Sequence, residues 1–293
     1  MVTPFDQDNL IDYEAVQRVV DFLLARGVTC LMVAGTTGEG MLLSLAERRA
    51  LLEVVVQHVA GRAPVIAHTG TIGTAETVDL THHAASAGAI AASVIVPYFF
   101  AFDDGALYKH FVSVAAAVPD FPVLLYTFPG NAKNDISPAL LARLLTAAPN
   151  IVGIKSSSPD LMRFLEYIQI GGDGFLAFCG VDGLMLPALA LGSRGQVSGN
   201  ANVYPELFRA LYDAFVGGNI ELARSLQQSV NRIRAVLGDG ISPAYFKAAL
   251  SLKCICERYV RPPIRELTSE ELERVRQGLH ALRIAELESS GRV

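Results

Sequence analysis

Short runs of apolar residues recur along the first two thirds of the chain, and each is followed by a turn and an amphipathic segment of helical length. From the second run to the sixth, successive ends lie roughly 30 residues apart, which is the size of one strand–helix unit. This spacing predicts a series of β/α units in which each apolar run forms a buried strand. The predicted strands are residues 2–3, 30–34, 64–67, 93–96, 123–126, 151–155, 175–179 and 196–197.

The segments between the predicted strands carry helix signals. Residues 16–23 place apolar side chains at i, i+3, i+4 and i+7, the spacing of one helical face. Ser44 and Glu47 have the spacing of a capping box, and Ser137 followed by Pro138 is typical of a helix start. Eight such units close a barrel, whereas six would more naturally form an open doubly wound sheet. Because the repeat continues unchanged to residue 197, we predict an α/β fold of the (β/α)8 TIM barrel class.

The two ends of the chain differ from this repeat. Only residues 1–4 remain for the first strand, which leaves open whether native residues precede Met1. After about residue 217 the pattern becomes helical, with helices predicted at 220–237, at 242–257 and from 269 onward. We therefore predict a barrel over residues 1–217 and a C-terminal helical extension over residues 218–293, packed on the barrel within the same domain.

Length, charge and cysteine usage narrow the class of protein. A chain of 293 residues suits one α/β barrel, and a net charge of −5 without a basic run argues against nucleic acid or a membrane surface as partner. Residues 1–10 include two aspartates and no long apolar stretch, so we expect no signal peptide. Four cysteines do not make a disulfide framework in a chain of this size, so we expect a cytoplasmic protein. No cluster of histidines and carboxylates has metal-ligand spacing, so we expect no bound metal.

Lys155 is the most informative residue for chemistry. Of the five lysines it alone ends an apolar strand, residues 151–155, and catalytic groups of such barrels project from the carboxyl ends of the strands. Burying an ammonium group without purpose costs on the order of several kcal/mol. Burial also favours the neutral amine, which is the form that attacks a ketone. The alternative is a structural lysine paired with a carboxylate at the barrel mouth.

Three further features lie at predicted strand ends. Tyr126 ends the strand before Lys155, where a phenol could transfer protons, although an aromatic lid over the core is the alternative. Residues 35–40 form a glycine- and threonine-rich turn that could hold a carboxylate or phosphate, and a plain tight turn is equally compatible with it. For Asp182, after another strand, we favour a helix cap over a site residue.

Several motifs in order make the chain resemble the dihydrodipicolinate synthase / N-acetylneuraminate lyase family over roughly residues 2–282. Their order and spacing together are specific to that family. The matching motifs are Val2-Thr3-Pro4-Phe5, Gly35-Thr36-Thr37-Gly38-Glu39, Val96-Pro97-Tyr98, Tyr126-Thr127-Phe128-Pro129, Gly153-Ile154-Lys155 and Gly195-Gln196-Val197-Ser198-Gly199-Asn200.

The resemblance implies a (β/α)8 barrel, usually a homotetramer, that works without metal or organic cofactor. It implies that Lys155 forms a Schiff base with pyruvate or a similar 2-oxo acid and that Tyr126 shuttles protons. The second substrate or product would be an aldehyde. The remaining site residues that it implies are Thr36 for catalysis and Gly35, Thr37, Gly38 and Val197 for binding of the 2-oxo acid.

Departures from the family pattern narrow the expected activity. Dihydrodipicolinate synthases usually carry a second tyrosine where this chain has Phe99, and an arginine that grips an acidic aldehyde where it has Asn131. Neuraminate lyases tend to have serine at the position of Thr36. The segment from Tyr126 resembles that of aldolases acting on 2-keto-3-deoxy sugar acids, although Thr127 stands where those enzymes have asparagine.

These residues favour a class I pyruvate-dependent aldolase that cleaves or forms a 2-keto-3-deoxy sugar acid. A sugar-acid dehydratase or a dihydrodipicolinate synthase-like enzyme would use the same Schiff base. A non-catalytic barrel that binds 2-oxo acids is an alternative of another class, which the presence of both Lys155 and Tyr126 disfavours.

Overall fold

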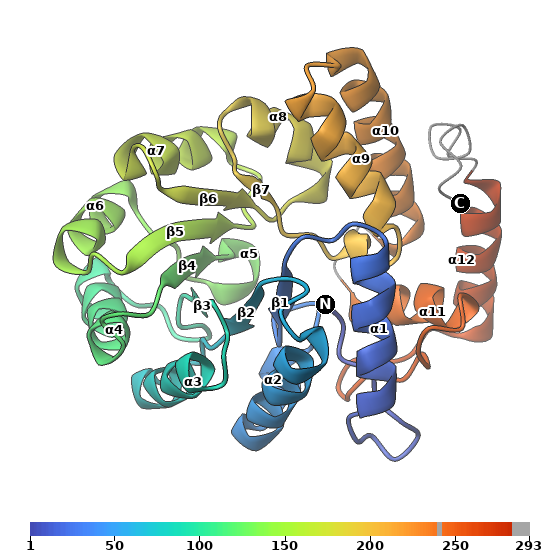
Figure 1. The fold of residues 1–293 in the computed structure, drawn as a ribbon, viewed down its shortest axis with the longest axis horizontal. Coiled ribbons are helices and arrows are strands. Elements are labelled where there is room, and N and C mark those ends of the chain that lie inside the picture. The colour runs from blue at the N-terminus through green and yellow to red at the C-terminus, as the bar shows by residue number, and fades with distance from the viewer. Residues whose placement is uncertain (239–241, 283–293) are drawn as a thin grey trace.

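The computed structural model describes residues 1–238 and 242–282. In this part of the chain seven strands form one parallel sheet in sequence order, and the sheet curls on itself with helices outside it (Figure 1). The barrel fold predicted from the repeat is confirmed. The strands are β1 (Leu31–Val33), β2 (Val65–His68), β3 (Ala91–Ile95), β4 (Val123–Thr127), β5 (Ile151–Ser156), β6 (Leu176–Cys179) and β7 (Gly195–Gln196).

Two of the helices that cover the sheet begin where the sequence signals predict. The capping box of Ser44 and Glu47 is formed, and Ser137 caps a helix whose first residue is Pro138. The covering helices are α1 (Tyr13–Ala25), α2 (Leu45–Val59), α3 (Thr74–Ser86), α4 (Asp104–Ala117), α5 (Pro129–Ala132), α6 (Pro138–Ala147), α7 (Leu161–Gly171), α8 (Met185–Ala190) and α9 (Pro205–Val216).

The predicted first strand at residues 2–3 is wrong, because these residues join no ladder. The amine of Met1 donates to the carbonyl of Met32 at 2.7 Å, and the amide of Val2 donates to Asn202 Oδ1 at 2.9 Å. The segment therefore lies between β1 and the 3-10 helix η3 (Asn200–Asn202) that follows β7. A ladder needs backbone partners on the adjacent strand, and here a side-chain oxygen takes that place.

The chain after α9 is helical in the part that the structure describes. It contains α10 (Ile220–Val236), α11 (Pro243–Leu252) and α12 (Ser269–Ala281). Helix α10 packs on α9, and α12 packs on α10 and α11 at the edge of the molecule (Figure 1). The helix predicted at 242–257 ends earlier, at Leu252, and parts of the predicted extension at 239–241 and 283–293 lie outside the described residues. The division at residue 217 stays a prediction.

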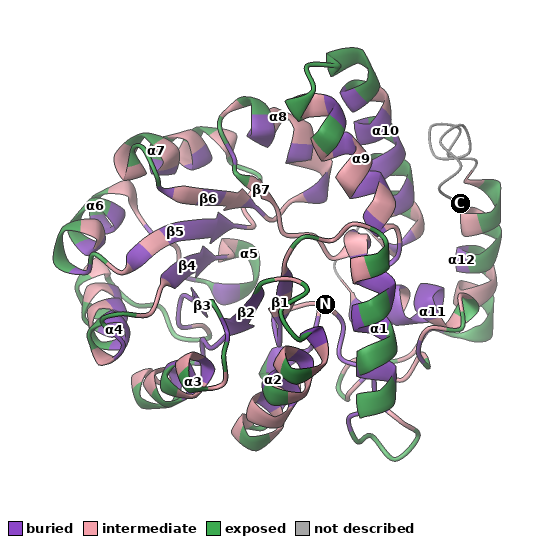
Figure 2. Ribbon diagram, in the orientation of Figure 1, coloured by how far each residue is buried: buried purple, intermediate pink, exposed green. Residues whose placement is uncertain are grey.

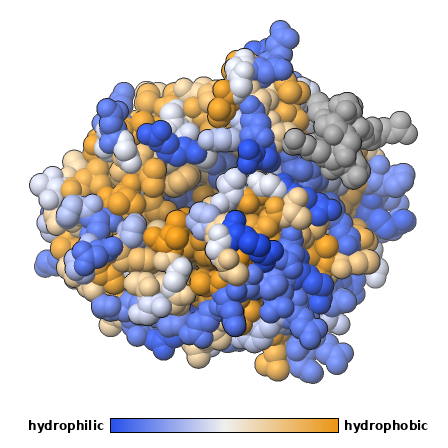
Figure 3. Space-filling model, viewed as in Figure 1, coloured by the Kyte–Doolittle hydropathy of each residue, from blue (hydrophilic) through white to orange (hydrophobic). Residues whose placement is uncertain are grey.

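Side chains alternate between the inside of the barrel and the helix layer along each strand, as the pleat requires. Ile66, Ala91 and Leu124 pack together inside the barrel, and strands β2 to β5 are buried along almost their whole length (Figure 2). On the face viewed in Figure 3, hydrophobic residues gather over the curled sheet. None of the described helices is long and apolar enough to cross a membrane. Because Tyr126 lies two residues beyond Leu124, it projects into the same interior, nearer the carboxyl ends of the strands.

Candidate active site

Lys155 and Tyr126 are direct neighbours on β5 and β4, where the ladder pairs their Cα positions. Lys155 is buried, and its Nζ lies 3.8 Å from the centroid of the Tyr126 ring. No carboxylate of residues 1–238 or 242–282 forms a salt bridge with it. An aromatic face attracts a cation but leaves the nitrogen without a negative counter-ion. The amine is thus placed beside the phenol, and the carboxylate-paired arrangement considered as the alternative is not found.

The hydroxyl of Tyr126 lies 3.2 Å from Thr36 Oγ1, at hydrogen-bonding distance. The ring is fully buried, and burial by itself would raise the pKa of the phenol. The positive charge of Lys155 and hydrogen bonds from Thr36, Ser157 and Lys155 act in the opposite direction, so that the pKa of Tyr126 is lowered from its ordinary value. A lowered pKa increases the share of phenolate, which is the form that accepts a proton from a substrate hydroxyl.

Residues 35–40 form a compact turn between β1 and the 3-10 helix η1 (Gly40–Leu42). The amides of Gly38 and Gly40 both donate to the carbonyl of Gly35, at 3.0 and 3.1 Å, and the turn folds back on itself. A Cβ at Gly40 would lie 1.8 Å from the carbonyl oxygen of Ala34, so only glycine fits there. The glycines predicted for this turn therefore shape its backbone.

The turn contains backbone donors that no described protein group uses. The amides of Thr36 and Thr37 take part in none of the backbone hydrogen bonds found in the described chain, whereas the amide of Glu39 donates to the Thr36 carbonyl. Both threonines are half-buried, while Gly38 and Glu39 are buried. Two free amides and two hydroxyls in one turn are suited to bind a carboxylate.

Asp182 does not cap a helix, so that prediction is wrong. It lies inside the 3-10 helix η2 (Asp182–Leu184), and its buried carboxylate accepts hydrogen bonds from Gln196 Nε2 and Ser198 Oγ at 2.8 Å and from Asn200 Nδ2 at 2.6 Å. Burial raises the pKa of Asp182, against the effect of these donors. The carboxylate therefore ties together the segment that carries Val197, the predicted main-chain lining of the site.

The sequence assigned no role to two residues that support the amine and the phenol, Gly180 and Arg48. A Cβ at Gly180 would lie 2.2 Å from Ser157 Oγ and 3.1 Å from Lys155 Cε, so the glycine leaves room for the lysine chain. The buried guanidinium of Arg48 donates to the backbone carbonyl of His68 at 2.6 Å, and the His68 ring packs edge-on against Tyr126. Burial, with the charges of Arg48 and Lys155, holds the pKa of His68 well below its usual range.

Lys155 is not the only buried lysine among the described residues. Lys247 on α11 forms an ion pair with Glu39, 2.5 Å apart, and neither side chain is exposed to solvent. Burial lowers the pKa of Lys247, while the charge of Glu39 opposes this effect. Removing one member of such a pair typically costs about 3–5 kcal/mol, because the other charge stays buried. Glu39 lies in the turn of residues 35–40, called the threonine turn below. That Lys247 on α11 is its partner could not be recognised from the sequence.

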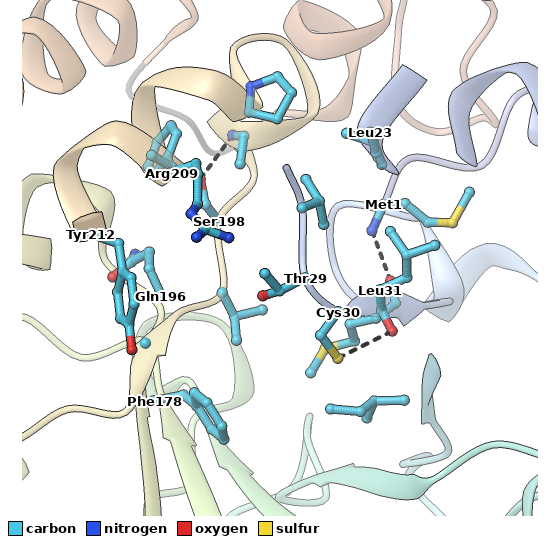
Figure 4. Close-up of a pocket in the computed structure, with 18 of the residues that line it drawn as sticks. Met1, Leu23, Thr29, Cys30, Leu31, Phe178, Gln196, Ser198, Arg209 and Tyr212 are labelled. Carbon is cyan, nitrogen blue, oxygen red and sulfur yellow. Dashed lines mark hydrogen bonds between the residues drawn. The ribbon is translucent and has the colours of Figure 1, made fainter. Parts of the chain in front are cut away.

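A cavity of about 390 Å³ opens between β1 and β7. Figure 4 shows Met1, Cys30 and Leu31 on one side of it and Gln196, Ser198 and Arg209 on the other. Lys155 and Val197 line this cavity, whereas Tyr126 and Thr36 do not. The cavity thus lies beside Lys155 but not beside Tyr126. The described residues contain no group of three or more histidine, cysteine or carboxylate side chains placed to hold a metal.

Comparison with known sequences finds one family across nearly the whole chain. The sequence model of the Dihydrodipicolinate synthetase family matches residues 1–282. A 4-hydroxy-tetrahydrodipicolinate synthase of Thermus thermophilus is 39% identical over 94% of this chain and 92% of its own length. The protein of that name from Bacillus subtilis is 35% identical over 92% and 93%. These names give no support to the expected closer likeness to sugar-acid aldolases.

Solved structures of the same family superpose on the fold. Dihydrodipicolinate synthase of Aquifex aeolicus has a TM-score of 0.92 at 34% identity, over 96% of this chain and 95% of its own. YagE, a prophage protein of E. coli K12 solved in complex with pyruvate, has a TM-score of 0.92 at 29% identity over 97% and 96%. The chain therefore belongs to the dihydrodipicolinate synthetase family of Schiff-base lyases.

Proposed function

We propose that Lys155 forms a Schiff base with the 2-carbonyl of pyruvate or of a 2-oxo acid that yields pyruvate. The observation that carries this proposal is the buried amine 3.8 Å above the Tyr126 ring, with no carboxylate bound to it in the described chain. The free amides of Thr36 and Thr37 hold the carboxylate of the 2-oxo acid. The backbones of Gly35, Gly38 and Val197 complete the wall around it.

In the cleavage direction the amine of Lys155 attacks C2 and water leaves, which produces a protonated imine. Tyr126, with its pKa lowered, accepts the proton of the C4 hydroxyl, and Thr36 stabilises the phenolate through its hydroxyl. The C3–C4 bond breaks, and its electron pair moves toward the imine, so that an aldehyde and an enamine form. Protonation of the enamine at C3 and attack of water on the imine then release pyruvate and restore the amine.

For the aldehyde we propose a polyhydroxylated partner, as in cleavage of a 2-keto-3-deoxy sugar acid. Asn131, at the end of the short helix α5, is exposed and offers no charge for a second carboxylate. Phe99, at the position of the second tyrosine, carries no hydroxyl. A dehydratase acting on a related sugar acid would use the same imine and expel a hydroxyl from it.

The second candidate is 4-hydroxy-tetrahydrodipicolinate synthase itself. It is favoured by the name of the relatives at 35–39% identity, which cover more than nine tenths of this chain. In that reaction the enamine of pyruvate would attack an acidic aldehyde. Because Asn131 stands where dihydrodipicolinate synthases usually carry an arginine, another group would have to bind the acid of that aldehyde.

One experiment distinguishes these activities. The purified protein is incubated with a panel of 2-keto-3-deoxy sugar acids, with separate assays for pyruvate release and for water loss, and with pyruvate plus aspartate semialdehyde. We expect pyruvate release from at least one sugar acid at a higher kcat/KM than the condensation. Faster turnover of aspartate semialdehyde would contradict the sugar-acid proposal, and water loss without pyruvate release would identify a dehydratase.

We also propose that the protein assembles as a homotetramer. Three phenylalanines after β3 are exposed in the single chain, Phe99 at 72%, Phe100 at 58% and Phe102 at 37%. Adjacent exposed aromatic rings are typical of a surface that a partner covers. We expect sedimentation velocity to give the mass of a tetramer, and Phe100→Asp to shift the protein toward smaller species. A monomer at micromolar concentration would contradict this proposal.

A further inference from the structure

The buried ion pair of Glu39 and Lys247 joins the threonine turn to a distant part of the chain. Its two charged atoms lie 2.5 Å apart, and both side chains are fully buried. Glu39 follows β1, whereas Lys247 lies on α11, beyond the strands of the sheet. A buried ion pair is weak evidence for stability, because the loss of hydration offsets the attraction between the charges. The location of the pair therefore points to a role other than stabilising the fold.

A short series of contacts leads from this pair to the phenol. The amide of Glu39 donates to the carbonyl of Thr36 at 3.1 Å, and the hydroxyl of Thr36 lies 3.2 Å from that of Tyr126. Glu39 has a φ of +55°, in the left-handed region that residues with a side chain adopt only when the surroundings hold them there. A shift of Glu39 would thus displace Thr36 directly.

The carboxylate of Glu39 is held from two sides by the C-terminal part of the described chain. Its Oε1 faces Lys247, and its Oε2 accepts a hydrogen bond from the amide of Arg261 at 2.8 Å. Lys247 Nζ is itself fixed, because it donates to the carbonyl of Tyr259 at 2.8 Å and lies 4.0 Å from the centroid of the Phe5 ring. Both charged groups are therefore held by contacts besides the ion pair itself.

Helix α11 also reaches the turn through the residue before Lys247. A Cβ at Gly199 would meet the ring of Phe246 at 2.8 Å and Thr37 Oγ1 at 3.2 Å. The Phe246 ring and Thr37 Oγ1 thus both lie close to Gly199. Lys247 thus contacts the turn through Glu39, and the preceding residue of α11 packs close to Gly199 beside Thr37.

We propose that Glu39 and Lys247 are positioning residues, which hold Thr36 and Thr37 in the geometry that binds the carboxylate of pyruvate. This role rests on the proposed function of the turn, and it names the contacts that hold the turn in place. The ion pair itself touches neither the substrate nor Lys155. Its loss should weaken binding of pyruvate more than it slows the chemistry of bound pyruvate.

The decisive variant is Glu39→Gln/Lys247→Met, which removes both charges and leaves no buried charge unpaired. Glutamine has the length of Glu39, and methionine is one atom shorter than Lys247. The probe is pyruvate alone, with borohydride trapping on Lys155 followed by intact mass. We expect the pyruvate concentration for half-maximal trapping to rise at least about tenfold, the scale of a displaced binding group, with full trapping at saturation. An unchanged half-saturation in the folded double variant would overturn the proposal.

Two further variants complete the test. Lys253→Met removes a half-buried amine directly after the same helix, where it donates to the carbonyl of Val203 and not to the turn, and should leave half-saturation unchanged. Should the double variant not fold, Glu39→Asp keeps both charges but draws the carboxylate back, and half-saturation should rise about threefold or more. A value equal to wild type would again overturn the proposal. Failure of the wild-type protein to be trapped would instead contradict the proposed function itself.

Discussion

Replacing Lys155 with alanine is expected to abolish turnover, with a loss of roughly 10⁴-fold or more, the scale seen when a covalent nucleophile is removed. The reason is that only the imine formed on Lys155 accepts the electron pair of the C3–C4 bond in the proposed reaction. No other described lysine lies beside Tyr126. The measurement is kcat/KM for the best sugar acid of the panel, together with borohydride trapping. The variant should form no adduct with pyruvate.

Replacing a different lysine by alanine tests whether the loss of turnover is specific to Lys155. Lys109 lies on α4 with an exposed side chain, so Lys109→Ala should keep both turnover and the mass adduct. Circular dichroism should show that Lys155→Ala folds, since alanine at an interior strand position leaves a cavity beside Gly180 but no unpaired charge. Turnover within tenfold of wild type in the Lys155 variant would exclude the Schiff-base mechanism.

The repeat of apolar runs was sufficient to predict the barrel and the strand ends that bring Lys155 and Tyr126 together. Each run from β1 to β6 could be located because a parallel strand is buried on both faces and therefore reads as continuous apolar sequence. The carboxyl ends of β4 and β5 then placed Tyr126 beside Lys155. The segment at residues 2–3 was misassigned because two apolar residues do not reveal that Asn202 takes the place of a backbone partner.

The supporting residues could not be predicted, because their partners are distant in sequence. Glu39 was visible only as part of the turn, and nothing near Lys247 in the sequence indicates that its amine is buried against that carboxylate. Asp182 was assigned as a cap on local grounds, although three donors from β7 and the segment after it hold it. Local patterns determine secondary structure and strand ends, whereas long-range polar contacts depend on how the barrel closes.

Replacing Tyr126 with phenylalanine is expected to lower kcat by roughly 10²-fold or more, in the range for lost acid–base catalysis. The phenylalanine keeps the aromatic face above which Lys155 Nζ lies, so the change removes the hydroxyl alone. Because the pKa of Tyr126 is lowered, the wild-type cleavage rate should rise with pH as the phenolate forms, beginning below the ordinary pKa of a phenol. In the variant this rise should be absent.

The control for this change is Tyr167→Phe, which also removes a buried hydroxyl. Tyr167 donates to the carbonyl of Ile136 at 2.5 Å, in the helix layer outside the barrel. Its loss should lower the free energy of unfolding by about 1–3 kcal/mol, since the Ile136 carbonyl loses its donor, without altering kcat or the pH profile. If Tyr126→Phe turned over at a near-normal rate, the proton would have to move through another group. Thr36 could not supply it, because an aliphatic hydroxyl is too weak an acid and its conjugate base too rare near neutral pH.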